Sequence, residues 1–179
     1  MRVRPFGRVG WPVSEVGYGL WGMGGWSGSN DDESVAALER AVGLGCTFFD
    51  TALAYGMGKS GKLLAKVVAR HRDKTLYVAT KIPPGNLRWP ALASYPLEDV
   101  FSRDHIRRST ETSLENLGIS CVDLQQFHVW SDAWAKDDRW QRAIHELKHE
   151  GLIRAFGISI NRWEPTNILR ALDTGLGDR

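Results

Sequence analysis

Four polar residues lie at or just after the ends of predicted strands, and together they could reduce a carbonyl group. Asp50 ends one apolar run, Tyr55 lies in the loop after it, and Lys81 and His128 end two later runs. A free phenol has a pKa of about 10, and a nearby ammonium group lowers that value, so the tyrosine could serve as an acid. A carboxylate would orient the lysine, and a histidine could donate a hydrogen bond to the carbonyl oxygen. The hydride must come from a cofactor, because no side chain supplies one.

Each of these residues also has an ordinary structural explanation when it is taken alone. Asp50 precedes Thr51 and could begin a turn, and Tyr55 could simply pack beside Gly56. A lysine at the end of a strand is usually solvated, and a lone histidine is often a hydrogen-bonded structural group. Four such residues at equivalent strand ends nevertheless favour one shared site over four coincidences.

The elements that must position these residues alternate along the chain. Short apolar segments predict strands at residues 16–20, 46–50, 75–81, 122–128 and 153–158. Between them, apolar residues at helical spacing predict helices at about 30–44, 59–71, 104–117, 140–147 and 165–173, with residues 82–103 irregular. Strands that alternate with helices imply right-handed crossovers and a parallel sheet.

Two closures of such a sheet are possible, an open doubly wound sheet or a barrel. Residues 17–22 fit G-x-G-x-x-G, but they lie in the first predicted strand and do not lead directly into a helix. That context disfavours the open dinucleotide-binding sheet. Five units average about 36 residues, so eight need about 290, which is within the range of barrels. We therefore predict one α/β domain over residues 1–179, of the TIM (β/α)8-barrel type, with about the first five β/α units present. Neighbouring strand ends then converge on one mouth.

Composition narrows the class of protein. Of the 179 residues, 42% are hydrophobic, which suffices for a core and excludes disorder of the whole chain. The 23 basic and 21 acidic residues give a net charge of +2, which disfavours a nucleic-acid binder. No apolar run reaches membrane-spanning length, and residues 1–5 lack the apolar centre of a signal peptide. Cys46 and Cys121 are expected to be buried thiols in a reducing, cytoplasmic compartment.

The sequence resembles the aldo-keto reductase family over essentially its whole length. Residues 6–17 are similar to the N-terminal hairpin that closes the barrel bottom in that family. The signature around Asp50 and Tyr55 is matched by Phe48-Phe-Asp-Thr-Ala-Leu-Ala-Tyr-Gly56. The other matching segments are Val78-Ala-Thr-Lys81, residues 113–118, residues 122–128 with His128, and residues 147–159.

The resemblance implies an activity and a role for each residue. It implies NADPH-dependent reduction of a small aldehyde or ketone, with Tyr55 as the general acid. Lys81 and Asp50 would tune Tyr55, and His128 would orient the substrate. The residues implied to contact NADPH or NADP+ are Gly22, Asp50, Ser159 and Asn161.

Tryptophan is abundant, with eight residues in the chain. Trp21, Trp26, Trp89 and Trp130 lie in or near loops at the expected mouth, where they could line an apolar pocket for the substrate. The alternative is that they cover the barrel rim without touching a substrate.

The chain also departs from the family pattern. Gly61 follows Ser60 where the family usually has Glu, and Ile160 separates Ser159 from Asn161. The resemblance ends before the last three β/α units, which hold the adenosine phosphate in the family. We therefore expect a C-terminally truncated barrel with two exposed strand edges, which favour self-association.

Two other functions stay open at this point. One is a catalytically inactive binding or regulatory subunit that keeps the four polar residues. The other is a metal-dependent hydrolase that uses Asp50 and His128, but no further cluster of metal ligands accompanies them, and no metal is expected. Basic clusters such as Arg70-His-Arg72 are expected to be solvated helix faces.

Overall fold

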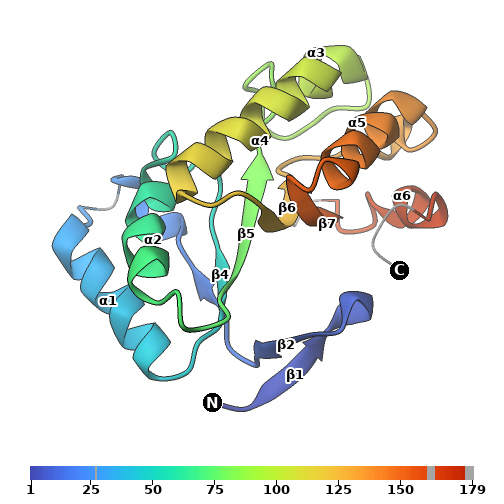
Figure 1. Ribbon diagram of the computed structural model, residues 1–179. Helices are drawn as coiled ribbons and strands as arrows, with labels where there is room; N and C mark the ends of the chain where they lie inside the picture. Colours follow the sequence, from blue (N-terminus) through green and yellow to red (C-terminus); the bar gives the residue numbers. More distant parts are fainter. Residues whose placement is uncertain (27, 161–163, 176–179) are drawn as a thin grey trace.

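A computed structural model describes residues 1–26, 28–160 and 164–175 of the chain (Figure 1). Its main sheet has five parallel strands, each paired with the next along the chain. These strands are β3 (Tyr18–Gly19), β4 (Phe48–Asp50), β5 (Tyr77–Ile82), β6 (Val122–Phe127) and β7 (Ile153–Ile158). The consecutive strand order confirms the predicted α/β fold with a parallel sheet. The prediction of a single domain over residues 1–179 stays a prediction.

The helices surround the sheet in an arc (Figure 1). They are α1 (Asp31–Gly43), α2 (Lys59–Arg70), α3 (Leu97–Phe101), α4 (Arg103–Leu117), α5 (Asp138–His149) and α6 (Leu169–Asp173). Three 3-10 turns accompany them: η1 (Gly7–Val9), η2 (Trp21–Gly24) and η3 (Asp132–Trp134). Helices α1 and α2, α2 and α4, and α4 and α5 contact one another, so the arc is continuous.

Capping residues explain where the longer helices begin and end. The Asn30 side chain accepts hydrogen bonds from the backbone N–H groups of Asp32 and Glu33, which starts α1. Ser102 caps α4 in the same way through the N–H of His105. Helix α4 ends at Gly118, whose φ of 64° is a left-handed conformation that suits glycine.

The core lies between the sheet and the helices. All six residues of β5 are buried, which is typical of a strand covered on both faces. An aromatic cluster fills the space between β6, β7, α3 and α5. Its members are Phe101, Phe127, Trp130, Trp134, Trp140 and Phe156. Phe127 stacks on Phe101 with ring centroids 4.0 Å apart.

The N-terminal hairpin covers the lower end of the sheet, as predicted. Strands β1 (Val3–Phe6) and β2 (Trp11–Ser14) pair antiparallel. Phe6 stacks on Phe48, the first residue of β4, and Trp11 stacks on Tyr77, the first residue of β5. The Arg154 guanidinium lies 4.6 Å from the centre of the Trp11 ring, which adds a cation–π contact.

Some predicted elements differ from the observed ones. The strand predicted at 16–20 forms a ladder only at Tyr18–Gly19, and the helix predicted from residue 165 begins at Leu169. Helix α3 lies in the segment predicted to be irregular. Cys46 is buried as expected, but Cys121 is only half-buried, and burial still raises the pKa of its thiol.

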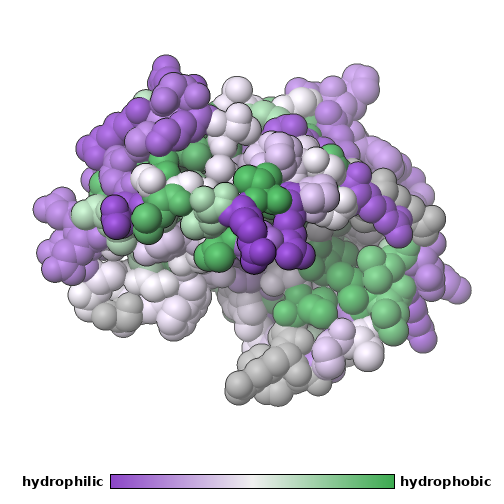
Figure 2. All heavy atoms as spheres, turned by 90° about the horizontal axis from the view of Figure 1, so that it is seen from below, coloured by the Kyte–Doolittle hydropathy of each residue, from purple (hydrophilic) through white to green (hydrophobic). Residues whose placement is uncertain are grey.

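Within the described residues, β3 and β7 each have a single neighbouring strand, so both edges of the sheet are open. Seen from below, hydrophobic residues gather in a recessed region, while the periphery is mostly hydrophilic (Figure 2). None of the helices in the described part of the chain is both long and apolar enough to cross a membrane.

Candidate active site

The sheet brings three of the four predicted catalytic residues to one end. Asp50 is the last residue of β4, Lys81 lies one residue before the end of β5, and His128 follows β6 directly. The His128 N–H donates to the Ile82 carbonyl at 3.0 Å, which holds the histidine beside the end of β5. Because the strands are parallel, their carboxyl ends meet at one edge, where active sites of such folds lie.

Lys81 is the centre of the polar contacts. Its side-chain nitrogen, Nζ, donates to Asp50 Oδ1 at 2.5 Å, to the Thr51 carbonyl at 2.8 Å and to Tyr55 Oη at 3.4 Å. The lysine is only 6% exposed. A buried ammonium group is stable only when it is paired and hydrogen-bonded, and these three oxygens provide both. The ammonium group therefore lies within reach of the tyrosine oxygen with its charge balanced by the aspartate.

Tyr55 comes from the loop between β4 and α2. A turn closed by the hydrogen bond from the Tyr55 N–H to the Ala52 carbonyl brings it back over the strand end. The Ser60 N–H donates to the Tyr55 carbonyl, and the Ser60 hydroxyl lies 2.7 Å from the Thr51 hydroxyl. These contacts tie both sides of the loop to the start of α2.

His128 lies next to Tyr55 and is uncharged at neutral pH. The two rings meet edge to face, with centroids 5.6 Å apart. Burial, reinforced by the charge of Lys81 and opposed by Asp50, lowers the pKa of His128 from 6.5 to about 4. The Nδ1 atom is buried without a partner among the described residues. A bare nitrogen is less costly there than an unpaired N–H, so we assign the proton to Nε2, which can donate to a carbonyl oxygen.

Three exposed tryptophans flank this site. Trp26 contacts Tyr55 edge to face, with ring centroids 6.1 Å apart, and Trp21 packs on Trp26 with centroids 5.5 Å apart. Trp89 contacts His128 edge to face at 5.9 Å. All three are exposed, so they form an aromatic rim around the tyrosine and the histidine.

The prediction that Trp130 lines the substrate pocket is wrong. Its side chain is 2% exposed and packs on Phe127 and Trp140 in the aromatic cluster. Its indole N–H donates to Asp132 at 2.9 Å, which satisfies the polar group inside the fold. The chain turns after His128, so a residue only two positions later enters the core instead of the mouth.

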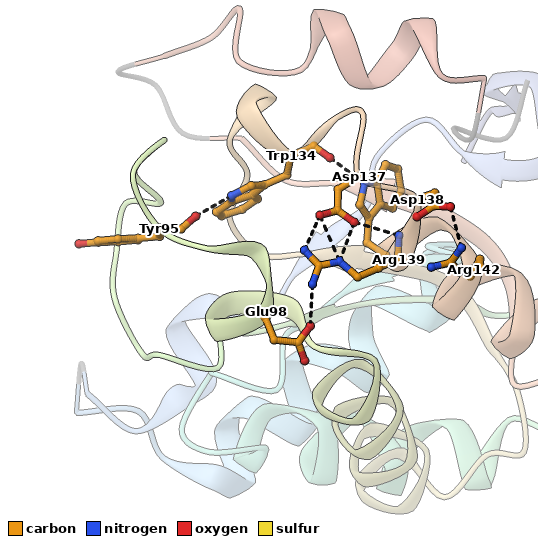
Figure 3. A network of polar contacts seen from close by, with 8 residues as sticks. Tyr95, Glu98, Trp134, Asp137, Asp138, Arg139 and Arg142 are labelled. Atoms are coloured by element: carbon orange, nitrogen blue, oxygen red, sulfur yellow. Dashed lines mark hydrogen bonds and ion pairs between the residues drawn. The ribbon is translucent and has the colours of Figure 1, made fainter.

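The loop that carries Trp89 is fastened to the helices around it. The Gly85 N–H donates to the Val100 carbonyl, and the Trp134 indole donates to the Tyr95 carbonyl at 2.9 Å. Figure 3 shows the second of these contacts beside an ion-pair network, in which Arg139 joins Asp137 and Glu98. The hydrogen bond from Arg139 lowers the pKa of Asp137. Both ends of the loop are therefore held, and Trp89 is presented on a tethered segment.

The Aldo/keto reductase family matches residues 15–174, which is most of the sequence. The chain belongs to the aldo/keto reductase family. Aldo-keto reductase YhdN of Bacillus subtilis is 32% identical over 168 residues, which cover 92% of this chain and 48% of that protein. Aldo-keto reductase yakc [NADP(+)] of Schizosaccharomyces pombe is 30% identical over 149 residues, which cover 82% of this chain and 42% of that protein.

Solved structures of aldo-keto reductases share the fold. The holo form of aldo-keto reductase AKR11C1 from Bacillus halodurans superposes with a TM-score of 0.77 at 27% identity. The superposition covers 97% of this chain and 54% of that structure. This likeness confirms the predicted barrel-type arrangement of the five β/α units. The chain spans about half the length of the relatives it matches.

Of the four residues that the family resemblance implies for cofactor binding, three lie in the part of the chain that the structure describes. Ser159 follows β7 directly, and its N–H donates to the Phe127 carbonyl at 2.8 Å, so it lies at the same end of the sheet as His128. Gly22 lies in η2, and a Cβ atom added there would meet nothing within 4 Å. Asp50 is already paired with Lys81. Asn161 lies outside the described residues.

Two contributors to the site were missed by the sequence analysis. The Thr51 carbonyl accepts from Lys81, a contact that no side-chain pattern reveals. Gln126 Nε2 donates to Asp50 Oδ2 at 3.4 Å. Gln126 stands two residues before His128 and pairs in register with Lys81, so strand alternation could have indicated it.

The described ranges contain no group of three or more His, Cys, Asp or Glu side chains that could hold a metal ion.

Proposed function

We propose that this chain takes part in the NADPH-dependent reduction of aldehydes or ketones, with Tyr55 as the general acid. The observation that carries the proposal is the buried Lys81 ammonium, which contacts Asp50 and lies 3.4 Å from Tyr55 Oη. Family membership supports carbonyl reduction as the reaction class. The substrate is a small carbonyl compound whose oxygen lies between Tyr55 and His128.

Each residue of the site has a different role in the proposed reaction. The Tyr55 proton passes from Oη to the carbonyl oxygen as negative charge develops on that oxygen, and the Lys81 ammonium lies beside Oη during this transfer. Asp50 holds Lys81 in place through the contact with its Oδ1. His128, as a neutral imidazole, donates from Nε2 to the same oxygen and orients the carbonyl. When bound, NADPH supplies the hydride that the carbonyl carbon accepts.

Two observations support a nicotinamide site at this end of the sheet. Ser159 directly follows β7, next to the strand that leads into His128, and a Cβ atom added at Gly22 would meet nothing within 4 Å. We propose that Gly22, Asp50, Ser159 and Asn161 hold the cofactor. One relative is named for NADP(+), while the NADH-specific methylglyoxal reductase of Escherichia coli is 27% identical over 171 residues. We propose NADPH as the preferred form.

Calorimetric titration of the folded chain with NADPH and with NADH tests the cofactor proposal. We expect saturable binding of NADPH in the micromolar range and weaker binding of NADH. If neither cofactor binds at millimolar concentration while the circular dichroism spectrum is that of a folded protein, this chain does not carry out the proposed reaction by itself.

Replacing the proposed acid tests the mechanism. Tyr55→Phe removes the hydroxyl and keeps the ring that packs against Trp26 and His128. Since a positioned general acid contributes about 10²–10⁴-fold to a rate, we expect carbonyl reduction to fall by that factor. The rate of NADPH oxidation with an aromatic aldehyde measures this. Turnover equal to that of the wild type would show that Tyr55 is not the acid.

A further inference from the structure

Two adjacent glutamines on β6 have opposite surroundings. The register pairs Gln125 with Thr80, and it pairs Gln126 with Lys81. Because side chains alternate along a strand, Gln126 lies on the same face as His128, and Gln125 lies on the other face. Gln125 is fully buried. Gln126 is only partly buried and reaches the catalytic aspartate.

The two oxygens of the Asp50 carboxylate have different partners. Oδ1 accepts from the Lys81 ammonium at 2.5 Å, and Oδ2 lies 3.4 Å from Gln126 Nε2. The Asp50 side chain is 35% exposed, so burial alone does not hold it. The terminal torsion of an aspartate is broad, and one contact leaves the carboxylate free to rotate about it. A second donor on the other oxygen restricts that rotation.

The Gln126 side chain also lies beside the neighbouring strand, β7. Gly157 on β7 pairs in register with Gln126. A Cβ atom added at Gly157 would be in ordinary van der Waals contact with Gln126, 3.4 Å from its Cγ and 3.9 Å from its Oε1. The Gln126 side chain therefore lies beside Gly157 of β7 and extends to Asp50 of β4.

We propose that Gln126 is a positioning residue that holds the Asp50 carboxylate in the orientation required to pair with Lys81. A neutral amide suits this place, because a carboxylate would repel Asp50 and a cation would compete with Lys81 for it. Loss of the amide therefore leaves Lys81 buried with a less ordered partner. The effect on Tyr55 passes through Lys81, and this last step rests on the proposed function.

The contact is tested by nuclear magnetic resonance on the chain with ¹⁵N-labelled glutamine side chains. The sequence has only three glutamines, Gln125, Gln126 and Gln141, so their amide pairs are readily assigned by substitution. We expect Asp50→Asn to move the Gln126 pair and to leave the Gln141 pair in place. Unchanged Gln126 signals in a variant with an otherwise folded spectrum would overturn the proposal.

The positioning role is tested with a matched pair of variants on the same strand. Gln126→Leu removes the amide beside Asp50, whereas Gln125→Leu removes an identical amide on the opposite face. With ¹⁵N-labelled lysine, we expect the Lys81 ammonium signal to shift or broaden in Gln126→Leu and to stay unchanged in Gln125→Leu. Equal spectra for the two variants would overturn the positioning role whether or not the chain is active.

The kinetic consequence separates this inference from the proposed function. We expect Gln126→Leu to lower kcat by about ten- to a hundredfold and to alter its pH profile, with little change in KM. Gln125→Leu should retain the kcat of the wild type and its pH profile. If the wild type itself does not reduce carbonyls, the proposed function fails, and the lysine signal still decides whether Gln126 positions the ion pair.

Discussion

The charge of the site is concentrated on one lysine and one aspartate, and the histidine beside them stays neutral. Lys81 Nζ lies 2.5 Å from Asp50 Oδ1. His128 has a pKa of about 4 because burial and the lysine both oppose its protonation. A neutral imidazole keeps a donor available without adding a second positive charge next to Lys81. The histidine is therefore a neutral hydrogen-bond donor at neutral pH.

The lowered pKa of His128 makes the folded state sensitive to acid. The histidine has a pKa of about 6.5 when unfolded and about 4 when folded, so the unfolded state binds the extra proton between these values. Its contribution to stability is present above pH 6.5 and is lost as the pH falls towards 4, by up to about 3 kcal/mol. Urea unfolding of the wild type and of His128→Gln from pH 7 to pH 4.5 measures this. The stability difference between the two proteins should shrink as the pH falls, and a constant difference would contradict the assignment.

The residues of the site were predictable to different degrees. Asp50, Lys81 and His128 end strands, and parallel strands must bring their ends together, so their proximity follows from the pattern. The position of Trp130 does not follow from it, because the turn after His128 determines whether that ring enters the core or the mouth. The backbone contact from Thr51 to Lys81 depends on the path of the loop, which no residue type encodes.

At the level of single elements, β6 leads into His128 of the site and also places a polar side chain, Gln125, in the core. Gln125 is completely buried, and neither its Nε2 nor its Oε1 has a partner among the described residues. A buried polar group without a hydrogen bond destabilises a fold by about 1–3 kcal/mol. The strand tolerates this beside the large aromatic cluster that packs on Phe127.

Replacing Gln125 by a hydrophobic residue of similar shape should stabilise the fold. In Gln125→Leu the unpaired amide is removed with little change in volume, and we expect a gain of about 1–2 kcal/mol in the free energy of unfolding. The midpoint of urea unfolding reports this gain. A lower midpoint would mean that the amide has a partner in solution, such as a buried water molecule.

The elements themselves were largely predictable from periodicity. Helices α2 and α4 lie within a residue of their expected limits because apolar spacing marks both, and Gly118 also marks the end of α4. Helix α3 was missed because five residues are too few to show a helical period. The strand at Tyr18–Gly19 is shorter than its apolar run, since only these two residues pair with β4.

At the level of the whole molecule, the hairpin and the sheet form one body through aromatic contacts. Trp11 stacks on Tyr77, and the Arg154 guanidinium lies against both rings. Arg154 also pairs with Asp123 at 2.6 Å. These contacts join residues near the start of the chain to the last strand of the sheet. The lower end of the sheet is thereby covered, opposite the end that carries the site.

Removing the Trp11 ring should release the hairpin without unfolding the sheet. Trp11→Ala deletes a stacking contact and a cation–π contact, which together contribute about 1–2 kcal/mol. We expect amide hydrogen exchange in residues 3–14 to become roughly tenfold faster or more, with β5 and β6 unchanged. Trp26→Ala, at the opposite end, is the control. Equal protection of the hairpin in all three proteins would show that other contacts hold it.

Among the described residues, β3 and β7 each lack a second neighbouring strand, and this supports our further proposal that the chain associates with itself, since unpaired edges accept other strands. Analytical ultracentrifugation over a hundredfold range of concentration tests it, and we expect the average mass to rise with concentration. A constant monomer mass would reject it. The cytoplasmic location stays a prediction from the sequence.

The positions of the tryptophans make their intrinsic fluorescence sensitive to binding at the site. Trp130, Trp134 and Trp140 are enclosed in the core, whereas Trp21, Trp26 and Trp89 are exposed around the site. The first group should emit at short wavelength and resist collision with iodide or acrylamide, and the second should emit at longer wavelength and be quenched. A molecule that enters the mouth will therefore shield one population of emitters and leave the other as an internal reference.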